Sequence, residues 1–257
     1  MSGPLAGRTI VVTRPARQSA AIATALRELG AEVVEFPSIR IVPVPPQVTD
    51  AAVVVDDFDW VIYTSVNAVA FAGRRIGAPA RAQVAAIGPA TAQALVRAGI
   101  RVAAQPQRGA DSEGLLALPV FAAPGGLRIL IVRGAGGRDV LKNELAQRGA
   151  SVEVVELYRR APETPTPAAM AELARALASG RVVIAVSSVD VLRALVGMVP
   201  AALDASLRAA TLVVPGPRVA ASARELGWQG ALIESAGAED AAMVRAIVEQ
   251  ARPTGQA

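Results

Sequence analysis

The stretch RILIVRGAGGRDVLKNELAQRGASVEVVELYRRAP (128–162) holds, in one run, the unit from which the fold is built. Its opening segment RILIV (128–132) is almost entirely apolar and predicts a buried strand. DVLKNELAQRG (139–149) has apolar residues at helical spacing and ends at glycine, a common helix terminator. SVEVV (151–155) predicts a second strand. Short apolar strands separated by a helix are typical of a parallel sheet with helices on both faces.

The same alternation runs through the whole chain of 257 residues, 53% of which are hydrophobic. The remaining apolar runs predict eight further strands: TIVVT (9–13), AEVVEF (31–36), WVIYT (60–64), QVAAI (83–87), IRVAAQ (100–105), VVIAV (182–186), TLVVP (211–215) and ALIES (231–235). Amphipathic segments that end at or near glycine predict helices between them: SAAIATALRELG (19–30), TAQALVRAG (91–99), VDVLRALVG (189–197) and RVAASARELG (218–227). Ten parallel strands in one small sheet would be unusual, so we expect two sheets of about five.

An internal repeat supports two similar halves. Placing Arg14 on Arg133 gives an offset that also pairs Gly30 with Gly149 and, without a gap, several further positions. A second pair of segments, YTSVNAV (63–69) and VSSVDVL (186–192), is also alike.

Two ways of dividing the chain satisfy this pattern. A sequential cut near residue 123 is one. In the other, the first two strands join the last three, and the five central strands form an inserted domain. IRIVPVP (39–45) and ELYRRAP (156–162) favour insertion, because both are short extended segments with prolines at their ends and could pair as a two-stranded connector.

Composition excludes several kinds of chemistry. The chain has no histidine and no cysteine, which rules out a thiolate nucleophile, a Ser-His-Asp triad and the usual zinc or haem ligand sets. Lys142 is its single lysine, so the other basic residues are all arginine, and Schiff-base chemistry would depend on one residue.

The basic residues favour an anionic ligand, although genomic base composition alone could also explain them. The net charge is +4, and guanidinium groups bind carboxylates and phosphates in a forked geometry. The arginines are scattered rather than clustered, so no nucleic acid is expected as a partner. No apolar run is long enough for a membrane span, and the start MSGPLAGRTIVV lacks a secretory signal, so a cytoplasmic location is expected.

Several segments, in this order and spacing, resemble the uroporphyrinogen-III synthase family along nearly the whole chain. They are VVTRPARQ (11–18), ELGAEVVEFP (28–37), YTSVNAV (63–69), IGPATAQAL (87–95), DSEGLLAL (111–118), VRGAGGRDVLKNELAQRGASVEVVELYRR (132–160) and VPGPRVAASARELG (214–227). The resemblance implies an α/β fold of two flavodoxin-like, doubly wound, parallel five-stranded domains. It implies that domain 1 spans 1–37 and 163–257, that domain 2 (43–155) is inserted in it, and that 38–42 and 156–162 form a β-ladder linker.

The resemblance also implies an activity. The family closes hydroxymethylbilane, a linear tetrapyrrole with acetate and propionate side chains, to uroporphyrinogen III, with loss of water and inversion of ring D. No cofactor and no metal are expected. The expected protein is a monomer, with hydroxymethylbilane synthase as a transient partner. A two-domain α/β protein that binds a small anion without catalysis is the alternative.

Tyr158 is the candidate catalytic residue. It lies in the return linker, matches the linker tyrosine of the family, and could donate a hydrogen bond to the leaving hydroxyl. Packing on the connector is the competing interpretation. Thr64, Ser65 and Ser188 follow predicted strands and offer hydroxyls and helix-start amides to a carboxylate, while helix capping is their alternative role.

Further candidates for substrate binding lie at other strand ends. Arg14 and Arg133 would bind carboxylates, or else pair with nearby acids. Gly134 begins the loop GAGGRD (134–139), whose glycines would let backbone approach a bulky ligand and which fails the dinucleotide-binding pattern at Asp139. The remaining candidates are Gly88, Thr91, Gly216 and Arg218. Ser112 and Glu113 match family residues as well, yet D-S-E before Leu-Leu also indicates an ordinary helix start.

Overall fold

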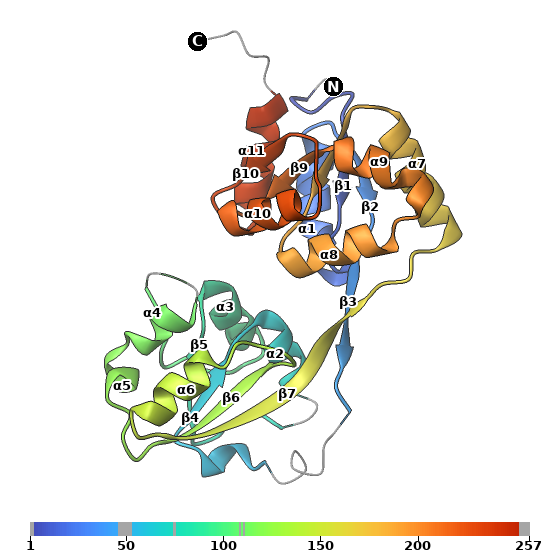
Figure 1. The fold of residues 1–257 in the computed structure, drawn as a ribbon. Helices are drawn as coiled ribbons and strands as arrows, with labels where there is room; N and C mark the ends of the chain where they lie inside the picture. Colours follow the sequence, from blue (N-terminus) through green and yellow to red (C-terminus); the bar gives the residue numbers. More distant parts are fainter. Residues whose placement is uncertain (1–2, 46–52, 74–75, 108, 110, 252–257) are drawn as a thin grey trace. The chain divides into compact units, whose positions relative to one another are not determined.

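The computed structural model describes residues 3–45, 53–73, 76–107, 109 and 111–251. The chain separates into two compact units (Figure 1): unit 1 comprises residues 1–40 and 161–257, and unit 2 comprises residues 41–160. None of the described helices is both long and apolar enough to cross a membrane.

The sheet of unit 1 is parallel in its pairings. It consists of β1 (Thr9–Val12), β2 (Glu32–Glu35), β8 (Val182–Ala185), β9 (Thr211–Val214) and β10 (Leu232–Glu234), in the order β10-β9-β8-β1-β2. β1 and β8 are buried along their whole length, which explains why every residue in them except Thr9 is apolar. The first two strands therefore share a sheet with the last three, and a sequential cut near residue 123 does not describe the chain.

Helices cover both faces of this sheet. α1 (Ala16–Glu28) and α11 (Asp240–Ala251) pack on one face. α7 (Pro167–Ala178), α8 (Val189–Met198), α9 (Ala201–Ala209) and α10 (Pro217–Glu225) pack on the other. The expected helical segments thus form α1, α8 and α10, and each of these amphipathic helices turns its apolar face to the sheet.

The sheet of unit 2 differs from expectation at one edge. It consists of β3 (Ile39–Pro43), β4 (Trp60–Tyr63), β5 (Gln83–Ala86), β6 (Arg128–Gly134) and β7 (Ser151–Pro162), in the order β3-β7-β6-β4-β5. The strand predicted at 100–105 is wrong, because only Ala104 forms a bridge there, to Ala85. The fifth strand is β3 instead.

β3 runs antiparallel to the end of β7. The amide of Val44 donates to the carbonyl of Leu157 (3.0 Å), and the amide of Glu163 donates to the carbonyl of Ser38 (3.0 Å), so residue numbers fall on one strand as they rise on the other. β7 itself is one continuous strand of 12 residues, in which the predicted strand 151–155 and the connector 156–162 merge.

Helices also flank the second sheet. α2 (Val66–Ala72) and α3 (Pro89–Arg97) pack on one face, and α4 (Ser112–Leu116), α5 (Pro119–Ala122) and α6 (Val140–Gln147) on the other. A short 3-10 helix, η2 (Val55–Asp57), precedes β4. The confirmed fold class is therefore α/β, with sheets whose strands are parallel except for β3.

Tyr63, at the end of β4, carries a buried hydroxyl that costs stability. The residue is 0% exposed, and its hydroxyl has no hydrogen-bond partner within the part of the chain that the structure describes. Burial raises the pKa of Tyr63 to about 12. We expect Tyr63→Phe to raise the free energy of unfolding by about 1 kcal/mol at pH 7, because it removes an unpaired polar group.

The same variant should behave differently in alkali. The unfolded chain ionises this tyrosine near pH 10, whereas the folded chain keeps its proton until about pH 12, so stability is lost as pH rises between these values. This loss reaches about 2 kcal/mol at pH 12 in the wild type and is absent from Tyr63→Phe. Urea titrations at pH 8 and pH 11 measure both effects. If the free energy of unfolding falls equally between these pH values in the wild type and in Tyr63→Phe, the assignment is contradicted.

Candidate active site

A pocket of about 320 Å³ lies in unit 2 at the carboxyl ends of β4, β6 and β7. This edge is where open α/β sheets usually bind ligands. Thr64 and Ser65 enter it directly after β4, Arg133 and Gly134 at the end of β6, and Tyr158 from β7. Five of the predicted site residues are thereby brought together.

A β-bulge places Tyr158 in this pocket. Arg133 pairs with Glu156, but the next residue, Gly134, pairs with Tyr158, so Leu157 is an extra residue in β7. The amide of Ala135 then donates to the carbonyl of Tyr158 (2.7 Å). Without the bulge, Leu157 would stand opposite Gly134.

Gly134 leaves room for the tyrosine ring. A Cβ atom built on Gly134 would lie 2.6 Å from Cε2 and Cζ of Tyr158 and 2.9 Å from its hydroxyl oxygen. Only a residue without a side chain therefore allows this approach. On another side the ring stacks on Phe71, with centroids 5.7 Å apart.

The hydroxyls of Tyr158 and Ser65 are hydrogen-bonded to each other, with 2.8 Å between the oxygens. Ser65 is also the N-cap of α2 and accepts from the amide of Ala68 (2.9 Å). Capping and a place in the pocket therefore coexist in one residue. The hydroxyl of Thr64 instead donates to the carbonyl of Val132 (3.2 Å).

Arg133 is held by acids at the pocket wall. Its guanidinium lies 2.9 Å from a carboxylate oxygen of Asp139 and 3.1 Å from one of Glu156, and it donates to the carbonyl of Arg138. The side chain is 14% exposed, so these pairs fix its orientation while leaving one side toward the pocket.

Three further basic residues line the pocket and were not predicted: Arg138, Lys142 and Arg160. Asp111 is the one acidic residue in the lining. Arg138 precedes the start of α6 and Lys142 lies in its first turn, and this place directly after the glycine loop could have indicated them. The pocket is therefore cationic, with a hydroxyl pair in its wall.

The DSE segment has the helix start that its sequence suggested. Asp111 is the N-cap of α4 and accepts from the amide of Gly114 (2.8 Å). Ser112 lines the pocket, whereas Glu113 does not. Gly88 is the N-cap of α3, and Thr91 is buried in that helix at 4% exposure; neither lines this pocket.

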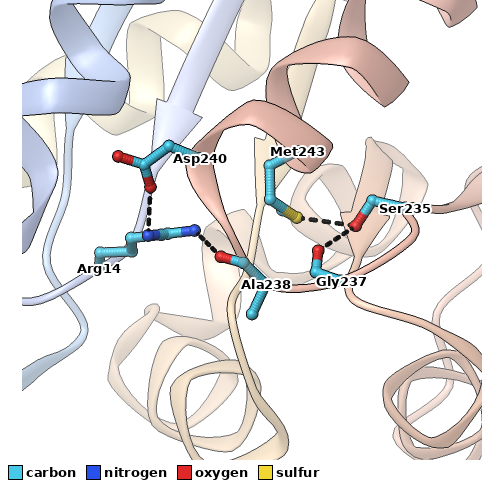
Figure 2. Close-up of polar contacts among 6 residues, drawn as sticks. All are labelled: Arg14, Ser235, Gly237, Ala238, Asp240 and Met243. Carbon is cyan, nitrogen blue, oxygen red and sulfur yellow. Dashed lines mark hydrogen bonds and ion pairs between the residues drawn. The ribbon is translucent and has the colours of Figure 1, made fainter. Parts of the chain in front are cut away.

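The other predicted residues belong to unit 1. Arg14 is 13% exposed, and its guanidinium pairs with Asp240 (2.5 Å) and donates to the carbonyl of Ala238 (Figure 2). The hydroxyl of Ser235 lies 2.7 Å from the carbonyl oxygen of Gly237 and holds the loop that carries Ala238.

Three strand-to-helix turns complete this group. Ser188 is the N-cap of α8 and accepts from the amide of Val191 (3.3 Å). Gly216, with φ of 92°, precedes α10 in the left-handed region that favours glycine. Arg218 is exposed in the first turn of α10.

Among the described residues, no three His, Cys, Asp or Glu side chains form a group that could hold a metal ion.

Comparison with known proteins gives a consistent result. A family model described as uroporphyrinogen-III synthase HemD matches residues 20–244. The uroporphyrinogen-III synthases of Escherichia coli (strain K12) and Salmonella typhimurium (strain LT2) are each 33% identical over 247 residues, covering 93% of this chain and 99% of theirs.

Solved structures show a similar fold. The uroporphyrinogen-III synthetase of Helicobacter pylori 26695 matches with a TM-score of 0.63 at 14% identity, covering 95% of this chain and 99% of that one. A mutant uroporphyrinogen III synthase from the extremely thermophilic bacterium Thermus thermophilus matches with a TM-score of 0.58 at 23% identity, covering 95% and 98%.

Proposed function

The chain belongs to the uroporphyrinogen-III synthase family, and from this premise we propose that it cyclises hydroxymethylbilane to uroporphyrinogen III with loss of water and inversion of ring D. The observation that carries the proposal is the hydrogen-bonded pair of Ser65 and Tyr158 in the wall of a cationic pocket. A hydroxyl pair suits a reaction whose first step is departure of a hydroxyl group.

The pocket residues would divide the work as follows. Arg133, Arg138, Lys142 and Arg160 attract the acetate and propionate groups of the substrate. The Tyr158 hydroxyl, which is hydrogen-bonded to Ser65, donates a hydrogen bond to the ring A hydroxyl as its C–O bond breaks. The departing hydroxide and the N–H proton of ring A leave together as water. The electron pair of the pyrrole nitrogen compensates the carbon left behind, giving an azafulvene.

Ring closure follows without another reactant. Ring D attacks the azafulvene carbon through its own substituted α-carbon, and rearrangement of the resulting spiro compound inverts ring D. Ring D then loses a proton, and the ring A nitrogen regains one. The protein supplies orientation and charge stabilisation, because the electrophile belongs to the substrate. Binding in a productive fold is then what separates this product from the uninverted isomer.

The same proposal covers the finer organisation of the protein. We assign two flavodoxin-like domains, 1–37 with 163–257 and 43–155, linked by 38–42 and 156–162. On domain 1, Arg14, Ser188, Gly216 and Arg218 would offer amides and guanidinium groups to substrate carboxylates, as would Gly88 and Thr91 on domain 2. We also propose that the protein is a cytoplasmic monomer and that it receives its substrate from hydroxymethylbilane synthase.

The rate of hydroxymethylbilane consumption tests the proposal. We expect the purified chain to accelerate disappearance of this substrate well above the spontaneous rate, with no added metal or cofactor. A protein that only binds anions would retain the substrate without accelerating its loss, and that result would reject the proposal.

Tyr158→Phe should lower kcat about tenfold, since it removes one hydrogen bond to the leaving group. The ring still stacks on Phe71, and Ser65 still caps α2, so the free energy of unfolding should change little. Steady-state kinetics and urea titration measure the two effects. Unchanged kcat would remove Tyr158 from the reaction.

Arg133→Gln should raise KM about tenfold while changing kcat less, because it removes a positive charge that acts on substrate binding. Arg101→Gln makes the same charge change at an exposed position of unit 2 and is the matched control. Equal KM values for the wild type and both variants would place Arg133 outside the binding site.

A further inference from the structure

A second pocket, of about 340 Å³, lies in unit 1, at the edge of the sheet where its strands begin. Gly7 and Arg8 line it just before β1, Gly180 and Arg181 just before β8, and Thr211 at the start of β9. β1, β8 and β9 are neighbours in the sheet. The residues that line this pocket include two cations and no acid.

The two arginines are aligned by the strand register. Thr9 pairs with Val182, so Arg8 and Arg181 each precede a paired residue by one position on parallel strands about 4.8 Å apart. Each follows a glycine in the left-handed region, Gly7 with φ of 74° and Gly180 with φ of 67°. The same Gly-Arg turn therefore occurs twice, side by side.

Neither guanidinium has an acidic partner in the described structure. Arg8 donates to the side-chain oxygen of Gln250 (2.9 Å) and to the carbonyl of Ala251 (3.3 Å), both neutral. These bonds hold it against the end of α11 and use two of its five N–H groups. Arg181 is exposed and forms no ion pair with the described residues.

The acid that pairs with the residue after Arg8 lies on the other face of the sheet. Glu32 pairs with Thr9 and accepts a hydrogen bond from its hydroxyl (3.1 Å). Successive residues of a strand point to opposite faces, so Thr9 and Glu32 face away from Arg8. Two like charges side by side, with no acid between them, repel each other, and an anion bound between them relieves this repulsion.

We propose that this pocket binds an oxyanion, a carboxylate or a phosphate group, between the guanidinium groups of Arg8 and Arg181. Arg8 is pre-positioned by Gln250 and Ala251, and Arg181 completes a forked contact. The hydroxyl of Thr211, from the third strand, provides a further donor. The site is separate from the pocket of unit 2 and does not depend on the proposed reaction.

Amide chemical shifts of the ¹⁵N-labelled full chain test the site. Inorganic phosphate and acetate are titrated separately, with sodium chloride holding ionic strength constant. We expect saturable shifts at Gly7, Gly180 and Thr211 with at least one anion, and the anion that saturates at lower concentration identifies the preferred chemistry. Shifts that grow linearly, or that sodium chloride alone reproduces, would overturn the proposal.

Two variants make the test specific. Arg181→Gln should weaken the anion affinity at these amides at least tenfold, and Arg181→Lys should retain part of it. Arg193→Gln makes the same charge change at an exposed position of α8, on the other face of the sheet, and should leave the affinity unchanged. Unaltered binding in Arg181→Gln would also overturn the proposal.

Discussion

A Gly134→Ala variant is expected to lose about two orders of magnitude in kcat/KM, more than the tenfold expected for Tyr158→Phe, because the new methyl group displaces the Tyr158 hydroxyl and also disturbs the substrate pocket that Gly134 lines. The new methyl group would lie 2.6 Å from two carbons of the Tyr158 ring. The ring cannot withdraw freely, since Tyr158 is 3% exposed and stacks on Phe71. The Tyr158 hydroxyl must then lose its hydrogen bond to Ser65.

A double variant separates this steric effect from a general effect of alanine at position 134. In a Tyr158→Leu background the ring is absent, so Gly134→Ala should cost much less stability than it does in the wild type, where overpacking costs about 1–3 kcal/mol. Urea titration of the four proteins gives the coupling energy. Additive costs would show that Gly134 and Tyr158 do not contact each other as described.

Gly230→Ala should produce the largest loss of stability, about 3 kcal/mol or more. A Cβ atom at this position would lie 2.0 Å from the carbonyl oxygen of Ala210 and 2.5 Å from that of Ala209. Both are backbone atoms at the end of α9, and the amide of Gly230 is bonded to the carbonyl of Arg208 (2.8 Å). Neither side can move without breaking main-chain contacts.

Gly197→Ala is the matched control. Gly197 lies inside α8, and a Cβ atom there meets nothing within 4 Å. Alanine should therefore stabilise by about 0.5–1 kcal/mol through its higher helix propensity. Thermal unfolding should move Tm down for Gly230→Ala and up for Gly197→Ala; a change of the same sign in both would contradict the steric explanation.

Most strands could be predicted from the sequence because buried strands consist mainly of apolar residues. The segments that form β1, β4, β8 and β9 are short apolar runs, and they are almost wholly buried in parallel pairings. IRVAAQ (100–105) has the same appearance but lies beyond β5, where main-chain bonds of Ala103 and Ala104 to β5 hold it without a continued ladder. Whether such a segment extends the sheet as a further strand depends on tertiary pairing, which the local sequence pattern does not show.

The candidate site was predicted in part for a similar reason. Thr64, Ser65 and Arg133 follow strands, and that position is visible in the sequence. The contact of Tyr158 with Ser65 depends on the bulge at Leu157, which shifts the register by one residue and has no sequence signature. Arg138 and Lys142 line the pocket from the junction of the glycine loop and α6, and local sequence does not show which strand ends this junction faces.

The isomer of the cyclic product tests the central claim most directly. Hydroxymethylbilane closes spontaneously without inversion, so only directed folding of the substrate yields the type III ring. Chromatographic separation after incubation with the purified chain should give predominantly uroporphyrinogen III. Uroporphyrinogen I alone, formed at the uncatalysed rate, would contradict the account.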